Sequence, residues 1–316
     1  MDLKHVLLGL QKNKMKKMKT LLTLAAAVGL VTTSLNAQIN TDGFFNKKGE
    51  TNIALSYTEA TFDEFYLGET RIDGVPVHNE IDQTVYDIYA NYGITDRLTV
   101  IANLPFIVAE GNGGADPVNG ETKQSDLQDI SLILKWAAFV KEENGNKVTG
   151  IATIGGSYAF DYEANGILSI GSGAPEIDAK LGLQYNDKSG FFGNAFVGYA
   201  LKGEADNTFG LGDGGKFDVP NSVNAQIKLG YAAQYFYVDA WFDAQKSNGS
   251  LDINDPDFAN RFPETKVDYS RIGLNVYVPI IKNLGLSAAA GRVISGRNVG
   301  VSTFFTGGLV IGLGKE

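Results

Sequence analysis

The sequence predicts an all-β protein, an antiparallel up-and-down transmembrane β-barrel of about 12 strands. Three observations predict it: an export signal at the N-terminus, a series of alternating segments, and connections between them that alternate in length. A tilted strand needs about 9–11 residues to cross the hydrocarbon core of a bilayer. Most of the segments found here approach or exceed that length, whereas strands of soluble sandwiches are typically about five or six residues long.

Residues 84–106 hold the clearest strand-turn-strand unit. Apolar and more polar residues alternate before a turn at Gly93, and the alternation resumes after it. Successive side chains of a strand point to opposite faces, so each arm has one apolar face. Gly93 and the pair Thr95-Asp96 supply the residue types of a tight turn. The unit is therefore predicted to be a membrane hairpin.

The rest of the chain repeats this unit. Strands are expected at about 50–60, the hairpin 81–107, 127–140, 148–160, 177–186, 191–202, 223–231, 236–243, 266–279, 284–295 and 299–313. Long connections follow the odd-numbered strands, at 61–80, 108–126, 161–174, 203–219 and 246–265. Short turns follow the even-numbered strands, and the last connection, near 296–298, is short where a long one is due. Bacterial outer-membrane barrels combine short periplasmic turns with longer outer loops, which predicts that both chain ends are periplasmic.

The first 37 residues have the organisation of a secretory signal peptide. An apolar run at 21–31 is followed by small and polar residues up to Ala37. It is preceded by three lysines, Lys16, Lys17 and Lys19. A basic region, a short apolar core and a small final residue predict cleavage after Ala37. The apolar run is too short for a comfortable transmembrane helix.

The start of the chain leaves one question open. Residues 1–14 are unusual ahead of such a signal, so translation starting at Met15 or Met18 is an alternative. Residues 38–316 are then predicted to form a single outer-membrane β-barrel domain.

Composition excludes several classes of protein. The formal charge is −9, and removing the signal takes away six lysines and one aspartate, which makes the remaining chain more acidic. An acidic chain is a poor nucleic-acid binder, because phosphate contacts need clustered Lys and Arg. The sequence has no cysteine, so disulfides and thiolate chemistry are excluded. No cofactor is expected.

Charged residues recur on one face of the predicted strands. They are Asp87, Lys135, Asp178, Lys180, Lys228, Asp239, Asp243 and Arg271. A mid-membrane Lys or Arg facing lipid costs about 2–4 kcal/mol, so this face is predicted to line the lumen. Two interpretations stay open: a hydrogen-bonded interior that holds the barrel together, or a selective path. Paired buried charges are often structural, which favours the first interpretation for any single residue.

Two motifs resemble a known family. One is Tyr92-Gly93-Ile94-Thr95-Asp96-Arg97-Leu98 followed by Leu104-Pro105, and the other is Ser125-Asp126-Leu127-Gln128-Asp129-Ile130-Ser131-Leu132. Together they are similar to the phenol-degradation MetA-pathway family of outer-membrane barrels, described as transporters. The resemblance implies a barrel that passes small hydrophobic or aromatic compounds, and it implies no catalytic residues. The chain departs from proteobacterial barrels in ending without a terminal aromatic residue, at Gly314-Lys315-Glu316.

An enzyme is not expected. Outer-membrane phospholipases need a serine activated by a positioned histidine, and removal of the signal leaves His78 as the only histidine. Residues 68–80 are polar and interrupted by Gly and Pro, so His78 is predicted to be an exposed loop residue. The acidic run 252–257 has oxygen ligands for calcium but lacks the Gly and Glu of an EF-hand loop. A solvated acidic loop is the better interpretation.

Two functional classes fit these observations. The first is a channel or transporter of the bacterial outer membrane for small, hydrophobic or aromatic solutes. The alternative is a structural or surface-interaction barrel with a plugged lumen. A barrel of about 12 strands has room for either, because about eight strands already fill themselves with side chains and 16–18 leave a water channel. The expected partners are outer-membrane lipid, such a solute and the barrel-insertion machinery.

Overall fold

The computed structural model describes most of the chain after the predicted signal. The described residues are 41–116, 120–162, 164, 168–206, 215–249, 251–256, 261 and 264–314. The predicted signal peptide, its cleavage point and the alternative starts lie outside them.

Twelve antiparallel strands close into one up-and-down barrel, which confirms the predicted fold class. In chain order they are β1 (Thr51–Phe62), β4 (Ile81–Thr95), β5 (Leu98–Gly111), β7 (Ile130–Glu143), β8 (Asn146–Tyr158), β9 (Glu176–Asn186), β10 (Phe191–Lys202), β13 (Ser222–Ala232), β14 (Tyr237–Ser247), β15 (Asp268–Ile281), β16 (Leu284–Arg297) and β17 (Thr303–Leu313). Each strand pairs with its neighbours in the chain, and β1 pairs with β17 to close the ring.

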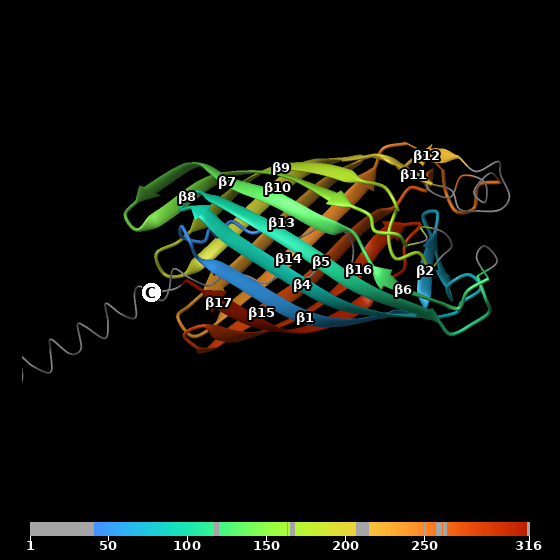
Figure 1. The fold of residues 1–316 in the computed structure, drawn as a ribbon, viewed down its shortest axis with the longest axis horizontal. Coiled ribbons are helices and arrows are strands. Elements are labelled where there is room, and N and C mark those ends of the chain that lie inside the picture. Colours follow the sequence, from blue (N-terminus) through green and yellow to red (C-terminus); the bar gives the residue numbers. More distant parts are fainter. Residues whose placement is uncertain are drawn as a thin grey trace, which may run out of the picture.

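The two ends of the barrel differ, as the connection lengths predict. Tight turns join β4 to β5, β7 to β8, β9 to β10, β13 to β14 and β15 to β16 at one end, on the left in Figure 1. We call it the turn end. Asn144 and Gly145 both have positive φ, 54° and 81°, which is the conformation that a two-residue hairpin needs. The longer connections lie at the other end, the loop end, and four short strands that pair with one another lie there. These strands are β2 (Glu64–Leu67), β3 (Thr70–Asp73), β11 (Glu204–Asp206) and β12 (Lys216–Asp218).

The last connection, between β16 and β17, is short and bonds to the β2–β3 hairpin. Strand β17 begins at Thr303 rather than near 299, and residues 299–301 bond to β2 instead. The amide of Tyr66 donates to the Val299 carbonyl, and the amide of Val301 donates to the Glu64 carbonyl, both at 2.9 Å. The β2–β3 hairpin thus folds against this connection.

The strand predicted at 127–140 is split in two. A short strand, β6 (Lys123–Leu127), pairs with the outer part of β5, and β7 pairs with the inner part. Pro105 on β5 has no N–H to donate, and its carbonyl accepts a bond from the Gln128 amide at 2.9 Å. The ladder is therefore interrupted where β5 carries its proline.

Alternation gives the barrel an apolar exterior. On β7, for example, Leu132, Leu134 and Trp136 are 57%, 41% and 52% exposed, whereas Lys135 between them is 2% exposed. A closed sheet also pairs its backbone groups all round the ring, which is what hydrocarbon demands. The exterior is therefore suited to lipid. None of the described residues forms a helix long and apolar enough to span a bilayer.

Candidate functional site

The lumen is where the chain gathers its charges. All eight charged residues predicted from the alternating pattern lie on the inward face, since each alternates with outward apolar residues of its strand. Whether they line a path for a solute stays a prediction. Their partners distinguish them from one another.

Six of the eight pair among themselves. Arg271 lies directly across from Asp243, and its Nε donates to Asp243 Oδ1 at 3.0 Å, with a second bond from Nη2. Lys180 Nζ lies 3.4 Å from Asp178 Oδ1. These two pairs have the geometry of structural ion pairs in a low-dielectric interior.

The third pair is looser. Lys228 Nζ lies 3.7 Å from Asp239 Oδ2, and both side chains are fully buried. Asp239 already accepts bonds from the Tyr237 hydroxyl and from Asn275 Nδ2. The Lys228 ammonium has no hydrogen-bond partner among the described residues.

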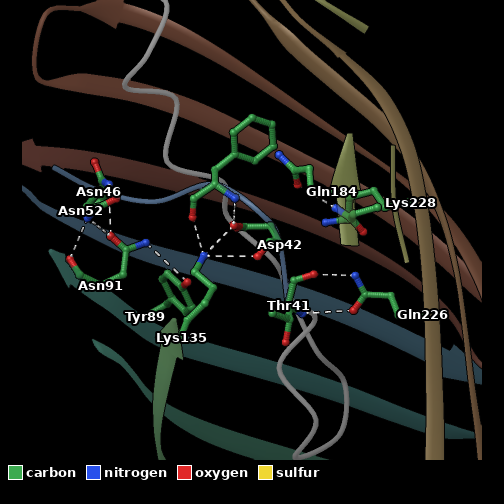
Figure 2. Close-up of polar contacts among 12 residues, drawn as sticks. Thr41, Asp42, Asn46, Asn52, Tyr89, Asn91, Lys135, Gln184, Gln226 and Lys228 are labelled. Carbon is green, nitrogen blue, oxygen red and sulfur yellow. Dashed lines mark hydrogen bonds and ion pairs between the residues drawn. The ribbon is translucent and has the colours of Figure 1, made fainter. Parts of the chain in front are cut away.

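A segment of the chain itself enters the lumen at the turn end. Residues 41–46 precede β1 and lie inside the ring of strands; we call them the N-terminal segment (Figure 2). Thr41, Asp42 and Asn46 are 3%, 5% and 7% exposed. The sequence shows these residues only as a polar lead ahead of the first strand.

Lys135 on β7 is the main anchor of this segment. Its Nζ lies 2.8 Å from Asp42 Oδ1 and also donates to the carbonyls of Asp42 and Phe44 (Figure 2). The ammonium also lies 4.9 Å from the centroid of the Phe45 ring. One inward lysine thus contacts positions 42, 44 and 45 of the segment.

Amide side chains of the wall supply further polar contacts. Gln226 on β13 bonds the backbone of Thr41 twice, from Nε2 to the Thr41 carbonyl at 2.6 Å and from the Thr41 amide to Oε1 at 3.1 Å. Asn46 donates to Asn91 on β4. Gly43 is required for the fit, because a Cβ there would lie 2.0 Å from the Gln184 side chain.

Apolar side chains fill the loop end of the lumen. Phe65 of β2 and Leu168 and Ile170 of the β8–β9 connection belong to one buried cluster with Trp241 and Phe304 of the wall. The rings of Trp241 and Phe304 are stacked, with centroids 6.1 Å apart. The lumen therefore has an apolar layer at the loop end. At the turn end it has a plug that is held by polar contacts and by the packing of Phe44 against Phe192 and Tyr237.

The outer loops are tied together by Arg297 and Asn298. Arg297 contacts Asp252 through two guanidinium nitrogens, at 2.6 and 2.5 Å, and reaches Glu69 at 2.6 Å. Asn298 accepts bonds from the amides of Gly68 and Ile253. The Arg297 guanidinium holds the pKa of Asp252 at about 2, below its ordinary value of 3.8. The acidic run predicted to be a solvated loop thus contributes its first carboxylate to a loop-to-loop contact.

The prediction for His78 is wrong. The side chain is 0% exposed rather than exposed, and Nε2 lies 3.4 Å from Asp116 Oδ2. Gly111 and Gly113 allow this burial, because a Cβ on Gly111 would lie 2.3 Å from the imidazole and one on Gly113 would lie 2.3 Å from the Val77 carbonyl oxygen. Gly111 and Gly113 are therefore positions of close approach to the loop that carries His78.

Comparison with solved structures supports the fold. An outer membrane channel from Pseudomonas putida F1 aligns with a TM-score of 0.69 and 15% identity, over 87% of this chain and all of that one. The translocator domain of the autotransporter NalP from Neisseria meningitidis aligns over 84% of this chain and 88% of that one, with a TM-score of 0.45 and 12% identity, too distant to argue from. No family model matches the sequence. No curated protein matches it either. The similarity to the first structure shows the barrel fold, and membership of the MetA-pathway family stays a prediction.

Proposed function

We propose that this protein is a channel of the bacterial outer membrane that passes small solutes, hydrophobic and aromatic ones in particular. The observation that carries the proposal is the N-terminal segment, which fills the turn end of the lumen without pairing as a strand. It is held to the wall by the side chains of Lys135, Gln226 and Asn91 and by the packing of Phe44 against Phe192 and Tyr237. Because the segment is held by side-chain contacts and not by strand pairing, it can leave the lumen while the backbone pairing of the barrel stays intact.

Polar atoms without a hydrogen-bond partner on the inward face of the barrel support a lumen that contains water. Asp87 Oδ1, Asn194 Oδ1, Lys228 Nζ and Ser287 Oγ are buried and have no hydrogen-bond partner among the described residues. Buried polar atoms of native proteins are nearly always bonded to protein or to water. We therefore infer that water or solute lies beside these atoms. A lumen closed to water would leave them without hydrogen bonds.

The apolar cluster at the loop end favours the solute class. A solute that enters from the loop end has to pass this cluster, which includes Trp241, Phe304 and Ile170. Aromatic and aliphatic side chains of this kind suit hydrophobic and aromatic bodies. The resemblance of the sequence to the MetA-pathway family implies the same class. Assembly in the membrane would need lipid and the barrel-insertion machinery as partners.

The alternative is a structural or surface-interaction barrel whose lumen stays plugged. The observation that favours it is that both ends of the lumen are filled, by the N-terminal segment and by the loop cluster. Under this alternative the segment never leaves, and the charged interior serves stability only.

Planar-bilayer recordings separate the two functions. We expect the intact protein to show small or brief conductances, and a variant lacking residues 41–46 to show larger and steadier ones. Liposome uptake of phenol and toluene measures solute flux on the same two proteins. A heat-modifiable, correctly assembled barrel that shows neither conductance nor flux in either form would reject the channel in favour of the plugged barrel.

A further inference from the structure

Asp87 on β4 is the one residue of the eight inward charges that lacks an oppositely charged partner. The other seven form ion pairs, three pairs among themselves and one between Lys135 and Asp42. No basic side chain of the described residues lies within 4 Å of the Asp87 carboxylate. Its neighbour Asn103 donates one hydrogen bond. The Oδ1 atom is buried and has no bond at all among the described residues.

The wall beside Asp87 is polar and made of small residues. Asp87 lies directly across from Ser56 on β1, Ser56 from Gly308 on β17, and Gly308 from Ser287 on β16. The hydroxyl of Ser287 also has no hydrogen-bond partner among the described residues. A Cβ at Gly308 would lie 2.7 Å from that hydroxyl oxygen and 3.2 Å from Ser56 Cβ. The glycine thus lets the Ser287 hydroxyl lie close to the β17 backbone, two strands away from Asp87.

Apolar layers lie on both sides of this row. Val85 and Tyr89 flank Asp87 on the inward face of β4. Val85 belongs to the buried cluster at the loop end, and Tyr89 belongs to a second cluster with Ala54, Ile101 and Val310. A solute that moves between the two ends along this side of the lumen passes one polar position between two apolar ones.

We propose that Asp87 is a binding position for the ammonium group of a small organic cation with an apolar body. The inference rests on the proposed channel function and names the chemistry of its solute. An unpaired buried carboxylate is strongly unfavourable, and a cation with N–H donors removes that cost. Ser56, directly across from Asp87, offers a hydroxyl acceptor to a further N–H of the same group. The acidic balance of the whole chain raises the local concentration of cations.

Three probes of similar shape test the proposal: benzylammonium, benzyl alcohol and benzoate. Titration calorimetry on the detergent-solubilised barrel needs no conduction. We expect benzylammonium to bind the natural protein and benzoate not to bind. Asp87→Asn, which keeps the shape and removes the charge, is expected to weaken benzylammonium at least about tenfold, the scale of a lost charged hydrogen bond, and to leave benzyl alcohol unchanged. Asp82→Asn is the matched control, because Asp82 is an exposed carboxylate of the same strand.

Reversal potentials in a potassium chloride gradient give a second readout. Asp87→Asn should reduce the preference for cations, whereas Asp82→Asn should not. Equal affinity of benzylammonium for the natural protein and Asp87→Asn, or equal binding of benzoate, would overturn the proposal. A barrel that shows no conductance in bilayers but binds benzylammonium through Asp87 would contradict the channel function and support the binding site. Should Asp87→Asn fail to assemble, Ser56→Val, which removes the hydroxyl directly across from Asp87, is expected to weaken the same probe.

Discussion

The Nζ atom of Lys135 lies 2.8 Å from Oδ1 of Asp42, and this buried ion pair joins the wall of the barrel to the segment inside it. The two side chains are 2% and 5% exposed. Removing a charge from water costs several kcal/mol, so each member depends on the other for compensation. The same ammonium also donates hydrogen bonds to two carbonyls of the segment. The closure of the turn end therefore depends strongly on one β7 side chain.

Replacing Lys135 should loosen the N-terminal segment. Lys135→Gln leaves Asp42 buried without its cation, a situation that typically costs about 3–5 kcal/mol, and the segment can escape this cost by leaving the lumen. We expect higher conductance in planar bilayers and faster proteolytic trimming of residues 41–46. Lys141→Gln is the control, because Lys141 is a lysine of the same strand with a side chain 75% exposed. Identical conductance and trimming in Lys135→Gln and the natural protein would show that the pair does not hold the segment.

The Arg271–Asp243 pair should behave as a structural pair. Asp243→Asn removes one partner of a guanidinium that is 3% exposed, so we expect a loss of about 3 kcal/mol or more in the free energy of unfolding. The double variant Asp243→Leu/Arg271→Met should recover most of this loss, because no buried charge is left unpaired. Urea unfolding of the refolded barrel in lipid measures both. A double variant less stable than the single one would contradict a purely structural role.

The barrel could be predicted because its signal is repeated in almost every strand. The number of strands and the inward position of charges such as Lys228 follow from the period-two alternation, since lipid accepts only one of the two faces. Asn144-Gly145 likewise identifies its turn by residue type. These features depend on neighbours in the sequence or in the adjacent strand.

The contents of the lumen could not be predicted in the same way. The contact between Thr41 and Gln226 spans 185 residues and involves a segment without periodicity. Nothing in the alternation distinguishes Asp87, which lacks an ionic partner, from Asp243, which has one across the strand pair. Asp42 becomes a partner of Lys135 only because Gly43 lets the segment approach the wall. Such pairings depend on the three-dimensional positions of side chains inside the closed barrel. The sequence predicts the strands of that barrel but not those positions.

Acid should open the contact between the outer loops. The pKa of Asp252 is held at about 2 in the folded loops by Arg297, against 3.8 for a free side chain. Because the folded value is lower, the contact stabilises the loops fully above about pH 4 and loses that effect as the pH falls toward 2. Hydrogen exchange of the Gly68 and Ile253 amides, corrected for the intrinsic rate, should show protection falling over this range. Asp252→Asn should have little protection at neutral pH and no such transition, and an unchanged protection of the natural protein down to pH 2.5 would exclude the mechanism.

Burial of His78 depends on the glycine at 113. Gly113→Ala places a methyl group 2.3 Å from the carbonyl oxygen of Val77, so the loop that carries His78 has to move away from β5. With the predicted signal removed, His78 is the only histidine, and its modification by diethyl pyrocarbonate can be followed directly by absorbance. We expect slow modification in the natural protein and fast modification in Gly113→Ala. Gly215→Ala is the control, because a Cβ there meets its nearest neighbour at an ordinary 3.6 Å. Fast modification of the natural protein would mean that the imidazole is accessible and that its contact with Asp116 does not close this loop.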